Sequence, residues 1–358
     1  INNKFYREDL GGVDWDFYAK SYKRFLPEIN NDYDMAEMLS EMLGELNASH
    51  TGARVGTTAP RQQTANLGAF FDDEYDGDGL KIKEIIKGGP LDFTGSKIKA
   101  GHIIKKIDGQ PIEKGKDYFP LLAGKSGKRT LLVLTDDKGK NEYEQEVIPT
   151  SSGAVGNLLY KRWVERRREM TEKYSGGRVG YVHVKAMNSE SFRDVFSEVL
   201  GKNRNKEALV VDIRHNGGGW LHDDLGILLS GKLYQTFEPR GQYIGSDPFM
   251  QWYKPSAVLM CENDYSNAHG FPFMYKALGI GKLVGAPMAG TMTAVWWETQ
   301  VNGRIVVGLP EVAVKDMSGK YLENQDLYPD VIVYQTPEER LKDNDVQLKK
   351  TIDTLLGK

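Results

Sequence analysis

Apolar residues near the N-terminus recur at spacings of three and four positions. These residues are Met35, Met38, Leu39, Met42, Leu43 and Leu46. A single apolar stripe of this kind predicts an amphipathic helix, within a helical segment that covers residues 1–57. Asn31 or Asp32 can cap the N-terminus of this helix, and the stripe ends near Asn47.

Short runs of alternating apolar and polar residues follow in residues 63–150. A polar stretch with a proline, residues 57–64, separates them from the helical segment. The predicted strands are Leu80–Ile86, Ile103–Ile107, Leu131–Thr135 and Tyr143–Ile148, with a turn at 136–139 between the last two. This pattern is typical of a small domain built from short strands.

A charged helix is predicted at 158–174, inside a connecting segment that spans residues 151–177. Its basic residues are Lys161, Arg162, Arg166, Arg167 and Arg168. Trp163, Val164 and Glu165 interrupt them, which favours the solvated face of a connecting helix over a nucleic-acid patch. The net charge of −3 also gives no global attraction for nucleic acid.

Nearly continuous apolar runs alternate with helical patterns in residues 178–358. The runs are Val179–Val184, Ala208–Ile213 and Ala257–Cys261, and each precedes a glycine-rich or polar turn. Such runs are typical of the buried strands of an α/β sheet, and a last helix is predicted at about 337–356. Because ligands bind beyond the C-terminal ends of such strands, the turns after Ile213 and Cys261 are the first candidates for a site.

The composition is that of a globular chain, with 40% apolar and 27% charged residues. No apolar run approaches the roughly 18 residues that cross a bilayer, so we expect a soluble chain without a membrane span. The single Cys261 cannot form an intramolecular disulfide, and the sequence does not distinguish cytoplasm from periplasm. The first residue is Ile1, without a signal peptide, which indicates a trimmed or partial product.

The turn after the second apolar run contains Gly217, Gly218 and Gly219. Consecutive glycines let backbone N–H groups approach a ligand closely. A flexible turn and a phosphate cradle are the alternatives, but the chain lacks a complete phosphate-loop motif, because Phe119 stands where its first glycine belongs. An oxyanion-binding turn fits better.

The turn after the third run, residues 262–272, leads into another predicted helix, with Pro272 in its first turn. A strand–turn–helix junction exposes a side chain at the helix N-terminus, where negative charge is stabilised. A nucleophile would belong here. The G-x-S-x-G motif of ordinary α/β-hydrolases does not occur in the sequence.

The stretch 98–112, with the pattern A-G-x-I-I-x-x-I-x-G from Ala100 to Gly109, resembles a characteristic segment of PDZ domains. Leu67 and Gly68 stand where such domains hold a peptide's terminal carboxylate. This resemblance implies peptide capture by strand addition. A generic spacer domain is the alternative.

Four separated motifs occur in the order in which tricorn protease cores carry them. They are Gly44–His50, Arg178–His183, Val211–Gly219 and Leu322–Asn324 before Pro329 and Asp330. On these motifs the chain resembles the tricorn core, in the superfamily of C-terminal processing peptidases. The resemblance implies an α/β (ClpP/crotonase-like) peptidase domain at 178–358, a helical N-terminal subdomain at 1–57 and an inserted PDZ-like domain at 63–150.

The resemblance also implies a serine peptidase that forms an acyl-enzyme. Processing peptidases use a lysine base, but the corresponding neighbourhood, residues 289–295, contains no lysine. Tricorn-like enzymes use a serine–histidine pair, matched here by Ser49 and His50. By this resemblance His50 is the general base, Ser49 orients it and Glu323 polarises Ser49.

Counted from Asn263, the nucleophile of the family falls on Ala268, whose methyl group cannot attack a carbonyl. Ser266, two residues earlier, is expected to be a turn or cap hydroxyl. Either a parental serine was replaced by Ala268, which makes this an inactive form, or the chain is a natural pseudopeptidase that binds peptides.

The predicted oxyanion donors are the backbone N–H groups of Gly218, or its neighbour Gly217, and His269. Gly219 is expected to bind substrate with the PDZ residues Leu67 and Gly68. We expect no metal and no cofactor, peptides or unfolded proteins as substrates, and a homo-oligomer. Two other functions remain open, a silent peptide-binding protein and a crotonase-like acyl-CoA enzyme.

Overall fold

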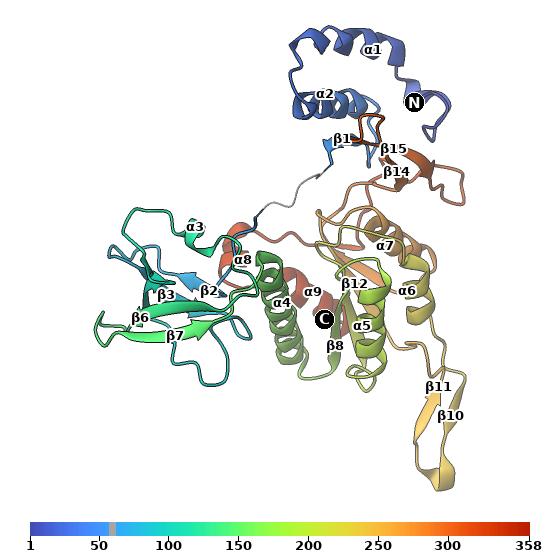
Figure 1. The fold of residues 1–358 in the computed structure, drawn as a ribbon. Helices are drawn as coiled ribbons and strands as arrows, with labels where there is room; N and C mark the ends of the chain where they lie inside the picture. The colour runs from blue at the N-terminus through green and yellow to red at the C-terminus, as the bar shows by residue number, and fades with distance from the viewer. Residues whose placement is uncertain (57–61) are drawn as a thin grey trace. The chain divides into compact units, whose positions relative to one another are not determined.

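The computed structural model describes residues 1–56 and 62–358, so the predicted boundary at Thr57 lies outside the described residues. The described chain forms two compact units (Figure 1). One contains residues 1–56 together with Arg167–Lys358, and the other contains residues 62–166. The N-terminal segment thus belongs with the C-terminal half of the chain.

The N-terminal segment is helical as far as Gly44. Its elements are η1 (Leu10–Gly12), α1 (Trp15–Lys23), η2 (Leu26–Glu28) and α2 (Asp32–Gly44). The predicted cap of α2 is confirmed, because the Asn31 side chain accepts hydrogen bonds from the N–H groups of Tyr33 and Asp34. The prediction of a helical segment up to residue 57 is wrong beyond α2, since β1 (Gly52–Val55) is a strand.

Strand β1 belongs to a three-stranded antiparallel sheet of order β1-β15-β14. Its partners are β14 (Thr293–Thr299) and β15 (Ile305–Ala313). A small core joins this sheet to the N-terminal helices and includes Phe5, Leu10, Leu43, Leu46 and Leu309. Among the described strands, β14 pairs only with β15, and it is therefore an edge strand of this sheet.

A parallel five-stranded sheet of order β16-β13-β12-β9-β8 forms the centre of the same unit. Its strands are β8 (Val179–His183), β9 (Ala208–Asp212), β12 (Ser256–Met260), β13 (Lys282–Gly285) and β16 (Val331–Ile332). The three apolar runs of the sequence correspond to β8, β9 and β12. Every residue of β9 and β12 is buried, which explains why these runs are continuous rather than alternating.

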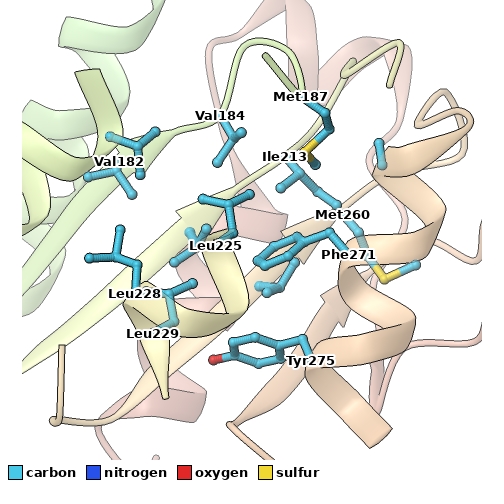
Figure 2. Close-up of a cluster of buried hydrophobic side chains, with 14 of the residues drawn as sticks. Val182, Val184, Met187, Ile213, Leu225, Leu228, Leu229, Met260, Phe271 and Tyr275 are labelled. Carbon is cyan, nitrogen blue, oxygen red and sulfur yellow. The ribbon is translucent and has the colours of Figure 1, made fainter. Parts of the chain in front are cut away.

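Helices α5 (Ser189–Leu200), α6 (His222–Leu229) and α7 (Asn267–Ala277) share one hydrophobic core with alternate residues of these strands. The register places Val182, Val211 and Val258 side by side across β8, β9 and β12, and all three belong to this core. Figure 2 shows Leu225 of α6 and Phe271 of α7 among the side chains of this core. Pro272 lies inside α7 rather than in its first turn, because the helix begins at Asn267.

The predicted single C-terminal helix is two helices, α8 (Pro337–Leu341) and α9 (Val346–Leu355). Between them Asp345 caps α9, and its fully buried carboxylate accepts hydrogen bonds from Arg214 at 2.9 Å. Arg214 also binds Asp212. This ion pair fixes the break in the helix and holds the turn after β9.

The second unit is an antiparallel domain of short strands. It contains β2 (Ala69–Phe71), β3 (Leu80–Ile85), β4 (Ile103–Ile107), β5 (Gln110–Pro111), β6 (Thr130–Thr135), β7 (Tyr143–Val147) and the short helix α3 (Phe119–Leu122). The strand order is β2-β3-β4-β6-β7, around a core that includes Leu67, Ile82, Ile104 and Leu132. Helix α4 (Ser152–Ser175) begins in this unit and ends in the other, and it starts earlier than the predicted 158.

The remaining elements, β10 (Gln235–Phe237), η3 (Pro239–Gly241) and β11 (Gly245–Asp247), form a separate two-stranded hairpin. No helix in the described ranges is long and apolar enough to cross a membrane.

Candidate active site

A cavity of about 310 Å³ opens in the first unit, where the turns after β9 and β12 meet the start of β14. Its lining residues are His50, Gly217, Gly219, Trp220, Tyr265, Ser266, Asn267, Met292, Thr293, Ala294, Val295, Val312 and Val314. Both turns predicted to carry chemistry therefore reach one cavity, together with His50 from the N-terminal segment.

His50 is held from several sides. Its Nδ1 atom lies 2.8 Å from the Ser49 hydroxyl and 3.1 Å from the Thr293 hydroxyl. Its backbone N–H donates to the Tyr265 hydroxyl at 2.8 Å, and the two rings pack with centroids 4.7 Å apart. In the described parts of the chain, the other ring nitrogen, Nε2, has no hydrogen-bond partner.

The hydrogen bond from Ser49 to Glu323 favours one tautomer of His50. The Ser49 hydroxyl donates to Glu323 Oε2 at 3.0 Å, and the Ser49 N–H also donates to this carboxylate. A hydroxyl that donates to Glu323 accepts from Nδ1–H of His50. The lone pair of the neutral imidazole is then on Nε2, the arrangement that a general base needs.

Burial shifts the pKa values of both ionisable groups. It lowers the pKa of His50 from its ordinary value of 6.5, because the imidazolium loses hydration. It raises the pKa of Glu323, although hydrogen bonds from Ser49 oppose that change. The neutral, proton-accepting form of His50 is therefore favoured.

Ser266 occupies the junction between β12 and α7, with φ 59° and ψ −124°. A non-glycine residue in this region is strained, and such strain collects at functional sites. The Ser266 N–H donates to the Thr291 hydroxyl at 2.8 Å, but the Ser266 side chain makes no capping hydrogen bond to α7. Ser266 was predicted to be a turn or cap hydroxyl; it stands at the N-cap position without a capping side-chain bond, and it lines the cavity.

Ala268 is completely buried and belongs to the same hydrophobic core as Phe271. It is not among the residues that line the cavity. One helical step inside α7, its backbone N–H donates to the Tyr265 carbonyl at 3.1 Å. Ala268 therefore belongs to the core of the unit and not to the cavity lining, and the assignment of the nucleophile to position 268 stays a prediction.

Two of the predicted oxyanion donors are already used within the protein. The Gly218 N–H donates to the Asn216 side chain at 2.8 Å, and the His269 N–H donates to the Ser266 carbonyl at 2.8 Å. Neither the Gly217 N–H nor the Asn267 N–H has an acceptor in residues 1–56 and 62–358, and both residues line the cavity. Gly217 is one of the predicted oxyanion donors, and Asn267 is a further candidate that the sequence did not indicate.

The His269 side chain, expected near the substrate, is buried instead. Its Nδ1 atom has no hydrogen-bond partner among the residues that the structure describes, and burial lowers its pKa to about 4. Gly219 does line the cavity, and only glycine fits there, because its φ is +136° and a Cβ would lie 2.1 Å from the Met187 carbonyl.

Asn216 and Asp264 hold the two turns together, a role that was not predicted for either residue. The fully buried Asn216 donates from its side chain to the Val184 carbonyl at 2.8 Å. Its N–H donates to Asp264 at 3.2 Å, and its carbonyl accepts from the Tyr265 N–H at 3.0 Å. The sequence signal that could have indicated the role of Asn216 is its position directly before three glycines.

Leu67 and Gly68, the predicted carboxylate-binding residues, lie in the other unit beside the edge strand β2. Leu67 is buried in the core of that unit. Gly68 has φ +70°, and a Cβ would lie 2.5 Å from Pro90. The Gly68 N–H donates to the Asn66 side chain at 2.7 Å.

Three family models match the chain in succession. The Tricorn protease C1 domain matches residues 1–44, the Tricorn protease PDZ domain matches residues 66–150, and Peptidase family S41 matches residues 178–333.

Individual relatives agree with these matches. Tricorn protease homolog 1 of Streptomyces coelicolor is 28% identical over 100% of this chain and 34% of its own length. The Tricorn protease of Thermoplasma acidophilum is 24% identical over 94% of this chain and 32% of its own length. The chain thus spans about a third of the length of these curated relatives.

A solved structure supports the fold. The crystal structure of the tricorn protease superposes with a TM-score of 0.85 at 22% identity, over 99% of this chain and 35% of that chain. With the three family models, these similarities show that the chain belongs to the tricorn-like serine peptidases of family S41 and carries a PDZ domain.

Proposed function

We propose that this chain is the hydrolytic part of a tricorn-like serine peptidase, with Ser266 as nucleophile and His50 as general base. The observation that carries the proposal is that both side chains line one cavity, with Ser266 on a strained strand-to-helix junction. Its substrates are peptides or unfolded proteins.

In the proposed reaction, Ser266 Oγ attacks the peptide carbonyl carbon while its proton moves to His50 Nε2. The negative charge on the carbonyl oxygen is stabilised by the N–H groups of Gly217 and Asn267, which have no acceptor within the described ranges. His50 then gives the proton to the leaving amine as the C–N bond breaks. Water, activated by the same imidazole, hydrolyses the acyl-enzyme and regenerates Ser266.

Ser49 and Glu323 are positioning residues in this proposal. Their hydrogen bonds keep the proton on Nδ1 of His50 and the lone pair on Nε2. The edge strand β14 begins beside this pair, at Thr293, and offers unpaired backbone groups to an extended peptide.

The alternatives based on Ala268 are an inactive form of an enzyme and a natural pseudopeptidase. Both require the nucleophile to stand at position 268, and the burial of Ala268 in the core argues against that position. The two readings make opposite predictions for Ala268→Ser. A serine there gains activity if position 268 is catalytic, but only adds a buried hydroxyl if Ser266 is the nucleophile.

The test uses peptide hydrolysis and labelling by a fluorophosphonate, with the adduct located by mass spectrometry. We expect an adduct on Ser266, and loss of hydrolysis and labelling in Ser266→Ala and His50→Gln. Ser318→Ala, which changes an exposed serine, is the control and should behave as the parent. An inert parent that becomes active through Ala268→Ser would overturn the assignment of Ser266.

Peptide binding by the PDZ-like unit is a second candidate function. The favouring observation is the edge strand β2 directly after Gly68, whose left-handed backbone suits a carboxylate-binding loop. Peptides with a free C-terminal carboxylate should then bind Ser266→Ala more tightly than the same peptides with a C-terminal amide. Equal affinities would contradict this function.

A further inference from the structure

We infer that the cavity selects peptides with a large apolar side chain directly before the scissile bond. This inference rests on the proposed function, since it assigns the substrate class of the same site. Its basis is the chemical character of the cavity wall and the position of Thr293, which contacts His50 and is flanked in the chain by two residues of that wall.

One wall of the cavity is apolar. It is formed by Trp220 and by residues of two neighbouring segments, namely Met292, Ala294, Val295, Val312 and Val314. In the described part of the chain, the residues that line this cavity include no aspartate, glutamate, lysine or arginine. The wall therefore offers contact area to an apolar side chain and no counter-charge to a charged one.

This wall begins directly at the catalytic histidine. Thr293, whose hydroxyl lies 3.1 Å from His50 Nδ1, is flanked in the chain by the wall residues Met292 and Ala294. In the substrate residue before the scissile bond, the side chain is attached to the α-carbon, which is bonded to the carbonyl carbon that Ser266 attacks. A substrate side chain that enters the cavity therefore meets this wall.

An irregularity in β14 helps to build the wall. The pairing of β14 with β15 shifts register between Ala294 and Val295, and a bulge of this kind redirects side chains next to a site. Ala294 faces Val312 across the pair, and the Val314 N–H donates to the Met292 carbonyl at 3.2 Å. The two segments of the wall are thus fixed to each other by backbone contacts.

A charged substrate side chain would lose its hydration here without gaining a partner, whereas an apolar one gains contact area. We expect kcat/KM for a peptide with leucine or phenylalanine before the scissile bond to exceed that for lysine or aspartate by about 100-fold.

The experiment compares four acetylated tetrapeptide aminomethylcoumarin amides that differ only in the last residue: leucine, phenylalanine, lysine or aspartate. Val312→Asp introduces a carboxylate at a wall position that is 43% exposed, so the fold can accept the charge. It should lower kcat/KM for leucine at least about tenfold and raise it for lysine by a similar factor. Val301→Asp is the matched control, because Val301 is fully exposed in the turn of the same hairpin and does not line the cavity.

The kcat/KM values of the unsubstituted protein for the four peptides test the inference even if Val312→Asp does not fold. A preference of the parent for lysine or aspartate, or no preference, would overturn it. So would a folded Val312→Asp with the profile of Val301→Asp.

Peptide binding, measured without hydrolysis, tests this inference separately from the proposed function. Affinities of the same four peptides for Ser266→Ala are measured by calorimetry. If the parent hydrolyses none of them, the proposed function has failed. At least tenfold tighter binding of the leucine peptide than of the lysine peptide would then still support apolar selection, and equal binding would refute it.

Discussion

The backbone N–H of His50 donates a hydrogen bond to the side-chain hydroxyl of Tyr265 at 2.8 Å. This bond joins the N-terminal segment to the turn that carries Ser266. His50 and Tyr265 are 215 residues apart in the sequence. Their hydrogen bond aligns the proposed base, His50, with the proposed nucleophile, Ser266.

Tyr265→Phe removes this acceptor and keeps the ring packing against His50. We expect kcat to fall about tenfold, because one hydrogen bond contributes about 1 kcal/mol and an error in alignment affects the transition state most. KM should change little. Steady-state kinetics measure both values, and Tyr243→Phe, which removes an exposed hydroxyl of the β10–β11 hairpin, is the control. A parental kcat in Tyr265→Phe would show that the bond does not align the site.

The lowered pKa of His50 gives a definite pH dependence. Only neutral imidazole can accept the Ser266 proton, and burial lowers its pKa from 6.5. On the acid side, kcat/KM should therefore reach half of its maximum below 6.5 and be fully developed at neutral pH. A pH–rate profile between about pH 4 and about pH 8 tests this. A midpoint above 6.5 would mean that Glu323 stabilises the imidazolium more than burial disfavours it.

Asn216→Ala should destabilise the protein as well as the site. The change leaves the Val184 carbonyl and the Gly218 N–H without their side-chain partner in a fully buried position. The expected loss in the free energy of unfolding is about 2–4 kcal/mol, measured by urea denaturation. Asn30→Ala removes an exposed amide that bonds Glu28, and it should cost less than about 0.5 kcal/mol. Similar losses in both variants would contradict the role of Asn216.

His269 should make the fold sensitive to acid. Its folded-state pKa of about 4 lies below its ordinary value of 6.5, so the folded protein disfavours the imidazolium. The resulting stabilisation is complete above 6.5 and is lost as the pH falls toward about 4, by roughly 3 kcal/mol in total.

The measurement is the free energy of unfolding of the parent and of His269→Gln across this pH range. The variant lacks the titrating group, so its stability should depend less on pH than that of the parent. Parallel curves would show that other groups, and not His269, cause the acid sensitivity.

The sequence by itself determined the local elements and the family. The spacing of apolar residues gave α2 with its Asn31 cap and the strand β4 at Ile103–Ile107. It also gave the buried strands β9 and β12, because a fully buried strand needs a continuous apolar run and a helix needs a stripe. The motif around Ser49 and His50 indicated the residues that are proposed as the base and its partner.

Only the tertiary structure decided which groups face the cavity. Ser266, at the junction before α7, lines the cavity, whereas Ala268, two residues later and inside α7, is buried in the core. The Gly218 N–H is not available to an oxyanion, because it donates a hydrogen bond to the Asn216 side chain. The break before α9 likewise depends on Arg214, 131 residues away from Asp345. Periodicity reports local burial, but side-chain direction and the partners of backbone groups depend on contacts between segments that are distant in the chain.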